Sequence, residues 1–113
     1  MLNVAEIDDF RQALLREMAD ISREEAASAD DRGTVQLDQQ SVGRLSRMDA
    51  MQRQAMAQAT SRRRAGRHSR IEAALRRIDE DEFGYCQECG EDIGKPRLTL
   101  DPTSPTCIGC AKA

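Results

Sequence analysis

The spacing of four cysteines constrains this chain more than any other feature. They occur as two Cys-x2-Cys pairs, Cys86 with Cys89 and Cys107 with Cys110, separated by seventeen residues. Two residues between paired cysteines let a tight turn aim both sulfurs at one metal ion about 2.3 Å away, and the separation of the pairs is typical of four-cysteine zinc sites. Because four thiolates complete a tetrahedron, we expect one structural Zn²⁺ with no position for a catalytic water.

Two other interpretations of the cysteines stay open at this stage. The four could form two disulfides, but the N-terminus lacks a basic region followed by an apolar run, and no stretch approaches the roughly 20 apolar residues that span a bilayer. We therefore expect a cytoplasmic protein with reduced thiols and no membrane association. A redox Cys-x2-Cys motif would lie in a βαβ pattern, which surrounds neither pair. Zinc is the favoured interpretation.

The chain is too short and too poor in aromatic residues to bury a large conventional core. It has 113 residues with no Trp, one Tyr and two Phe. It lacks a Gly-rich phosphate loop and a nucleophile elbow, and it offers little core in which a pKa could be shifted. We therefore expect no enzymatic activity, and we interpret the single histidine, His68, as a surface residue.

Apolar residues recur at helical spacing along two segments. The first runs from about residue 4 to 29, where Asn3 and Glu6 resemble a capping box. The second runs from about 41 to 78, after a turn or frayed segment at 28–40. A helix of about 35 residues would be about 50 Å long, so it must lean on the first, and we expect an antiparallel hairpin coiled coil. Its predicted seam consists of Ile7, Phe10, Leu14, Met18 and Ile21 on the first helix, and of Val42, Leu45, Met48, Ala55, Ala59, Ile71, Leu75 and Ile78 on the second.

A change of pattern divides the chain into two parts. From Phe83 onward, Gly, Pro and Cys punctuate the sequence. We therefore predict a mainly α-helical fold, with a long helical hairpin in residues 1–80 whose tip lies around residues 30–50. A small four-cysteine zinc ribbon in residues 81–113 follows it. We expect a monomer.

Charge is segregated along the chain although the net charge is only -3. Residues 1–40 hold ten acids and four Arg, residues 62–77 hold seven Arg and one acid, and residues 79–92 hold seven acids and no base. The basic segment is either a solvated helix face, partly offset by the acidic first helix, or a contact for a polyanion such as nucleic acid, a nucleotide or an acidic protein surface.

The segment Asp79–Gly94, with Arg97-Leu98, Pro102-Thr103 and Cys107-Ile108-Gly109-Cys110, resembles the DksA/TraR zinc-finger family. The resemblance implies a bacterial regulator that binds RNA polymerase directly and not promoter DNA in a sequence-specific manner. Such a regulator inserts its coiled-coil tip through the secondary channel toward the active centre. It modulates initiation, often alongside ppGpp, the alarmone of the stringent response.

The resemblance also indicates which residues would form the tip. The best-known members carry Asp-x-x-Asp-x-Ala there, and counting back from Cys86 without gaps places this pattern at residues 43–48, where none of its residues occurs. An acidic residue and an alanine follow directly. The candidates for polymerase contact are therefore Arg44, Ser46, Arg47, Asp49 and Ala50.

The family's alarmone contact uses basic residues of the second helix and the ribbon. The same register supplies Arg63, Arg67 and Arg70 from the helix, whereas Arg97 is displaced from the ribbon position. We therefore expect a weak or absent response to ppGpp.

Two alternative functions remain open on the sequence. The chain could be a zinc-ribbon module that binds nucleic acid through the basic helix at residues 62–77. It could also be an adaptor whose hairpin docks another coiled coil.

Overall fold

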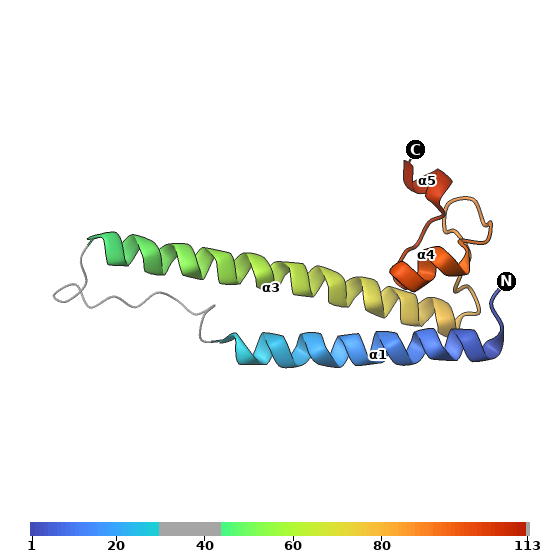
Figure 1. Cartoon of the computed structure of the whole chain (residues 1–113), viewed down its shortest axis with the longest axis horizontal. Coiled ribbons are helices and arrows are strands. Elements are labelled where there is room, and N and C mark those ends of the chain that lie inside the picture. Colours follow the sequence, from blue (N-terminus) through green and yellow to red (C-terminus); the bar gives the residue numbers. More distant parts are fainter. Residues whose placement is uncertain (30–43, 113) are drawn as a thin grey trace. The chain divides into compact units, whose positions relative to one another are not determined.

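A computed structural model describes residues 1–29 and 44–112. The described part contains no strand, and its helices are α1 (Val4–Ala27), α3 (Arg44–Asp79), α4 (Lys95–Leu100) and α5 (Ile108–Lys112) (Figure 1). The mainly α-helical fold class is therefore confirmed. Residues 30–43, which include most of the predicted turn, much of the predicted tip and Val42 of the predicted seam, lie outside the described residues.

The chain divides into two compact units. Unit 1 consists of Met1–Ala19 and His68–Ala113, and unit 2 consists of Asp20–Arg67. The predicted boundary after residue 80 follows the order of elements along the sequence, whereas the units follow the contacts in space. That boundary stays a prediction.

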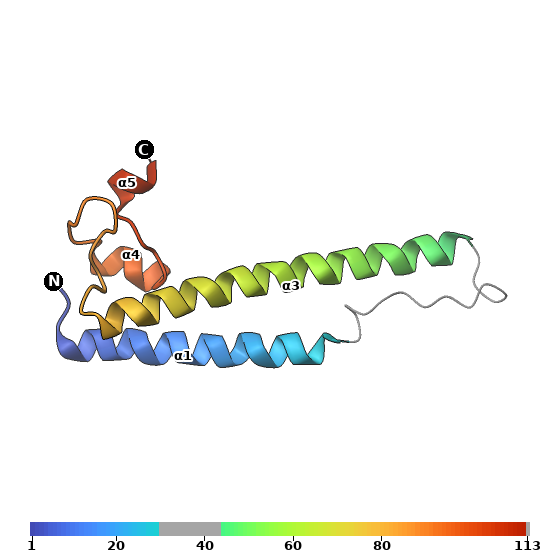
Figure 2. The same ribbon diagram turned by 180° about the vertical axis from the view of Figure 1, so that it is seen from behind.

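Apolar side chains from α1, α3 and the cysteine-containing segment form the core of unit 1. The start of α1 lies beside the end of α3 in both ribbon views (Figures 1 and 2). Phe10 of α1 meets Phe83, just beyond α3, with ring centroids 5.6 Å apart and planes tilted by 52°. The pairing is antiparallel, as predicted. The most deeply buried apolar residues are Leu14, Ile71, Ala74, Ile78, Phe83, Cys86 and Leu98.

The capping box predicted at the start of α1 is confirmed. The Glu6 backbone N–H donates to Asn3 Oδ1 at 2.8 Å, and the Asn3 backbone N–H donates to Glu6 Oε1 at 3.1 Å. This reciprocal pair satisfies two of the N–H groups that a helix start leaves unpaired. Glu6 also forms an ion pair with Lys95, Nζ to Oε2 at 2.5 Å, which ties the start of α1 to α4.

A Schellman motif ends α3 and turns the chain toward the cysteines. The Glu82 N–H donates to the Arg77 carbonyl at 2.8 Å, and Asp81 adopts a φ of 60°. The Arg77 guanidinium also donates to the Thr103 carbonyl at 3.4 Å. On the other side, Arg11 Nη1 of α1 lies 3.5 Å from Asp79 Oδ1. The end of α3 is thus joined both to α1 and to the segment that follows.

Unit 2 is joined by a polar cluster between its two helices. Ser61 Oγ donates to Glu25 Oε2 at 2.5 Å, and Arg64 Nη1 lies 3.2 Å from Glu25 Oε1 and 2.9 Å from Ser28 Oγ. The last turn of α1 thus lies beside Ser61 and Arg64 of α3. Because the two helices run antiparallel, the turns of α3 that come before these residues in the sequence extend beyond the described end of α1. There Met48 is 56% exposed, and the prediction that Met48 and Ala55 are buried in a seam is wrong.

No helix in the described ranges combines the length and the hydropathy needed to cross a bilayer.

Candidate metal centre

Two tight turns present the four cysteines. In the first, the Cys86 N–H donates to the Glu91 carbonyl at 2.7 Å, and the Gly90 N–H donates to the Cys86 carbonyl at 2.9 Å. Gly90 has a φ of +78°, which a residue without a Cβ adopts freely. In the second turn, the Ala111 N–H donates to the Cys107 carbonyl at 2.9 Å. The first pair is thus held by a turn, whereas in the second pair Cys107 directly precedes α5 (Ile108–Lys112), which contains Cys110.

The sulfur atoms are arranged for a tetrahedral metal site. All four lie within 4.8 Å of one another, and the sulfurs of Cys89 and Cys107 are 3.7 Å apart. A zinc ion with four sulfurs at about 2.3 Å has sulfur–sulfur edges of about 3.8 Å, so the arrangement fits zinc. The four cysteines are free thiols, which excludes the disulfide interpretation. They are Cys86, Cys89, Cys107 and Cys110.

The thiol pKa values show why the cluster needs a cation. Burial raises the pKa of Cys86, but backbone N–H donors outweigh this effect and lower it to about 6. The N–H of Glu91 lowers the pKa of Cys89, yet the hydrogen bond with Cys86 and burial leave it raised. Hydrogen bonds with the other three cysteines raise the pKa of Cys110 to about 12. One thiolate is therefore stabilised by the backbone, and a divalent cation is needed to hold four.

Two further hydrogen bonds hold the two cysteine pairs together. The Gln87 N–H donates to the Pro105 carbonyl at 2.8 Å, and Arg97 Nε donates to the Thr106 carbonyl at 2.9 Å. The second bond fixes the residue directly before Cys107. Sequence reasoning proposed Arg97 only as a polyanion contact and missed this positioning role, because no motif links the two residues.

The predicted tip residues lie in the first turns of α3. Arg44 is the first residue of that helix. Ser46 and Asp49 are exposed, whereas Arg47 and Ala50 are half-buried. Residues three and four apart on a helix share a face, so the spacing puts Ser46, Asp49 and Ala50 on one face. Their part in polymerase contact stays a prediction.

The predicted alarmone residues are divided between the two units. Arg63 and Arg67 belong to unit 2, and Arg70 and Arg97 belong to unit 1. On α3 the spacing of four and then three places Arg63, Arg67 and Arg70 on one helix face. Arg63 and Arg70 are exposed. A binding role for these residues stays a prediction.

His68 is half-buried and pairs with a neighbour on its own helix. Its Nδ1 lies 2.6 Å from Glu72 Oε1, one turn further along α3. The two residues form an i,i+4 pair on the surface of α3. His68 is also far from the four cysteines in the sequence. The sequence had placed it on the surface without identifying its partner.

Comparison with known proteins places the cysteine module in a family. Residues 81–113 match the prokaryotic dksA/traR C4-type zinc finger. Among curated proteins, the RNA polymerase-binding transcription factor DksA of Haemophilus influenzae is 54% identical over 41 residues, and that of Escherichia coli K12 is 44% identical over 41 residues. Each match covers 36% of this chain, but only 28% and 27% of these relatives. The chain thus matches little more than a quarter of their length.

A solved structure matches the fold over a longer range. Transcription factor DksA2 from Pseudomonas aeruginosa superposes with a TM-score of 0.80 and 27% sequence identity, covering 98% of this chain and 84% of that one. The zinc-finger match, the curated relatives and this likeness agree with the clustered thiols. Residues 81–113 thus match the C4-type finger of the DksA/TraR family, with four clustered thiols for one structural zinc ion, and the chain as a whole is similar in fold to DksA2.

Proposed function

We propose that this protein is a non-enzymatic regulator that binds bacterial RNA polymerase and modulates transcription initiation. The observation that carries the proposal is the likeness to DksA2 over 98% of the chain, joined to relatives named RNA polymerase-binding transcription factor DksA. The four thiolates fill the coordination of a zinc ion, so the metal braces the fold and activates no water. The protein would act as a monomer in the bacterial cytoplasm, where polymerase works.

In this proposal the first turns of α3 enter the secondary channel and approach the active centre. The exposed side chains of Ser46 and Asp49 would contact polymerase there, with Arg44, Arg47 and Ala50 beside them. Support comes from unit 2, where these turns lie beyond the described end of α1. Among these residues the side chains of Ser46 and Asp49 are exposed, so they are open to a second protein.

The response to ppGpp would be weak. Arg63, Arg67 and Arg70 share one face of α3, but Arg97 is committed to the Thr106 carbonyl. A guanidinium that already donates to a backbone carbonyl has fewer N–H groups left for a phosphate.

The alternative of nucleic-acid binding through residues 62–77 loses part of its support. Arg64 lies within 3.5 Å of both Glu24 and Glu25, and Arg77 donates to the Thr103 carbonyl. Guanidinium groups engaged in this way contribute less to phosphate binding. Polymerase is the better supported partner.

The test combines binding with initiation. Zinc-loaded protein should retain purified core polymerase in a pull-down at low salt and should change the yield of initiation at a purified promoter. Asp49→Asn should retain binding and lose most of the effect on initiation, because that carboxylate would lie near the active centre. Asp20→Asn, an exposed acid elsewhere in unit 2, is the control. Failure to bind polymerase at low salt, with salt-dependent binding to random duplex instead, would favour the nucleic-acid alternative.

A further inference from the structure

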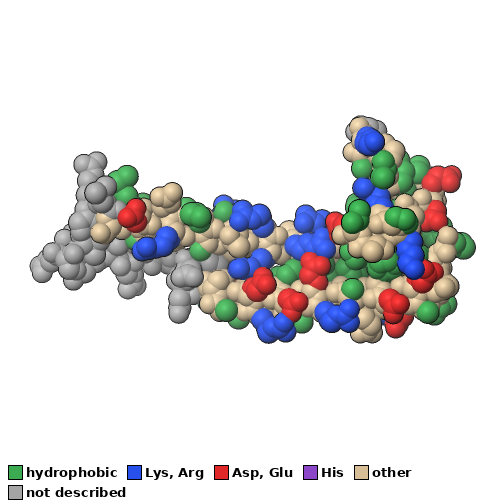
Figure 3. All heavy atoms as spheres, viewed as in Figure 1, with side chains coloured by type: hydrophobic (Ala, Val, Ile, Leu, Met, Phe, Trp, Pro, Cys, Tyr) green, Lys and Arg blue, Asp and Glu red, His purple; other side chains and the backbone are tan. Residues whose placement is uncertain are grey.

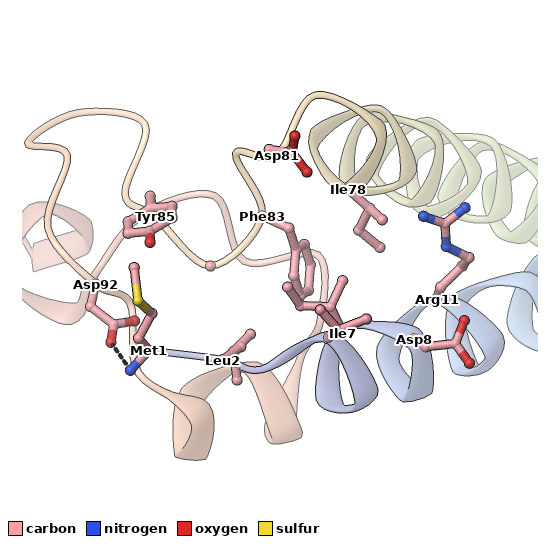
Figure 4. A pocket seen from close by; sticks show the side chains of 12 residues that line it. Met1, Leu2, Ile7, Asp8, Arg11, Ile78, Asp81, Phe83, Tyr85 and Asp92 are labelled. Carbon is pink, nitrogen blue, oxygen red and sulfur yellow. Dashed lines mark ion pairs between the residues drawn. The ribbon is translucent and has the colours of Figure 1, made fainter.

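A cavity of about 330 Å³ lies in unit 1 where α1, the end of α3 and the zinc finger meet (Figure 4). We call it the α1–finger pocket. Ile7 of α1, Ile78 of α3 and Phe83 of the finger converge on it in the close-up view. Val4 also lines it and is 85% exposed. The apolar surface therefore continues from the cavity onto the outside of α1.

The rim of this pocket is acidic. Asp8 of α1 and Asp81 beyond α3 both line it, and neither forms an ion pair within the described part of the chain. The lining also holds two cationic groups: Arg11, which lies 3.5 Å from the carboxylate of Asp79, and the N-terminal ammonium of Met1, which pairs with Asp92 at 3.0 Å (Figure 4). Both cations are thus paired with carboxylates, and the segment at residues 79–92 contains seven acids and no base. The pocket combines an apolar floor with a negative potential.

Asp81 holds its place on this rim at a conformational cost. Its φ of 60° lies in the left-handed region, and it is the single non-glycine residue with positive φ among the described residues. Glycine is the usual residue at this position of a Schellman motif, because a Cβ is disfavoured there. The chain instead has a carboxylate, which helix termination alone does not require.

We propose that the α1–finger pocket binds an aliphatic side chain of a partner protein, presented on a segment that also carries Lys or Arg to face Asp8 and Asp81. Charge complementarity selects this occupant, because an acidic rim repels nucleic acid and anionic lipid. The exposed side chain of Val4, another lining residue, extends the apolar contact beyond the cavity, which suits a polypeptide segment better than a small cation. The pocket is remote in sequence from the tip candidates on α3, so it adds a second contact surface to the protein.

Nuclear magnetic resonance with the full, zinc-loaded, ¹⁵N-labelled chain tests this proposal directly. The probe is a twelve-residue peptide with one central Leu flanked by Lys on both sides. We expect saturable shifts of the Val4 and Gly84 amide signals. A peptide with Glu in place of Lys, and a second with Ser in place of Leu, should each bind at least tenfold more weakly, because the rim requires a cation and the floor requires an apolar side chain.

Two matched pairs of variants locate the site. Asp8→Lys should weaken peptide binding at least tenfold, whereas Asp9→Lys, the same charge change at the next residue, should not, because Asp9 is exposed and does not line the pocket. Val4→Ser should weaken binding and Ala5→Ser should not, for the same reason. Both pairs are at exposed positions, so folding should be preserved.

Three results would overturn the proposal: no shift at the pocket amides, equal binding of the Lys and Glu peptides, or equal effects of Asp8→Lys and Asp9→Lys. Binding of spermidine as tight as that of the Lys peptide would also overturn it, since a small cation would then be the better ligand. No polymerase enters this experiment, so its outcome is independent of the proposed function.

Discussion

Glu6 has two partners, and both stabilise its ionised form. The ion-pair hydrogen bond from Lys95, followed by the backbone N–H of Asn3, lowers the pKa of Glu6 below its ordinary value of 4.5. A carboxyl whose pKa is lower in the folded state contributes stability that is present above its unfolded pKa. That contribution is lost as the pH falls through the lower, folded value.

The corresponding prediction concerns Glu6→Gln. Wild-type protein should be more stable than this variant at neutral pH, and the difference should shrink once the pH falls below 4.5. Urea unfolding of both zinc-loaded proteins across this range measures it, with Asp9→Asn, another exposed acid of α1, as control. If the difference in unfolding free energy between the two proteins stays constant as the pH falls below 4.5, the charge of Glu6 does not contribute to stability.

Asp81 gives a second prediction at the residue scale. Replacing it with glycine should raise the free energy of unfolding by about 0.5–1 kcal/mol, because glycine adopts the observed φ of 60° without strain. Glu80→Gly, one residue earlier, is the matched control and should not stabilise. Chemical denaturation of zinc-loaded protein measures both. A destabilised Asp81→Gly would show that the carboxylate has a stabilising contact in the folded state.

Helix α3 is the longest element, and its weakest position in intrinsic helix propensity is Gly66. The helix continues through this glycine from Arg44 to Asp79. A Cβ built there meets nothing within 4 Å. Gly66→Ala should therefore stabilise the protein by about 1 kcal/mol, through the lower backbone entropy of alanine in the unfolded chain.

Thermal unfolding followed by circular dichroism measures this change. Gly84→Ala is the contrasting control, because Gly84 has a φ of +92° and a Cβ there would lie 3.3 Å from Leu2. It should destabilise. If Gly66→Ala and Gly84→Ala change the melting temperature in the same direction and by the same amount, the backbone conformation at these two positions does not determine the change in stability.

The zinc finger is the element that depends most on its ligand. Its buried apolar side chains are Phe83, Cys86, Ile93 and Leu98, and one of these is a metal ligand. The finger should lose its fixed structure when a chelator removes zinc, because structural zinc supplies apparent energies of roughly 10–16 kcal/mol. Fluorescence of Tyr85, the single tyrosine in a chain without tryptophan, reports on this element. One equivalent of Zn²⁺ should restore the wild-type signal but not that of Cys86→Ser. If the NMR signals of the finger's backbone amides stay equally well dispersed after chelation, the finger does not need zinc to fold, which would contradict the account.

At the scale of the whole molecule, the elements that follow from local rules could be predicted. The Cys-x2-Cys spacing identifies the metal ligands, and helical periodicity identifies α1 and α3. The capping box follows from Asn3 and Glu6 alone. Each depends on residues a few positions apart, so the sequence contains the full pattern.

Contacts between distant residues could not be predicted in this way. The pairing of Glu25 with Ser61 and Arg64 depends on the register of two helices, and a thin seam of Ala and Met does not specify that register. The bond from Arg97 to Thr106 likewise depends on how the finger folds around its metal. Met48 continues the helical period of the seam, but no described residue of α1 extends far enough to cover it.

The central claim is that the first turns of α3 act inside RNA polymerase, and site-specific cross-linking tests it most directly. A photoreactive residue at the exposed Ser46 should cross-link, in the presence of polymerase and promoter DNA, to polymerase segments that line the secondary channel near the active centre. The same residue at Arg16, exposed on α1, should not reach those segments. Cross-links from Ser46 to DNA alone, or to no part of the polymerase near its active centre, would contradict the account.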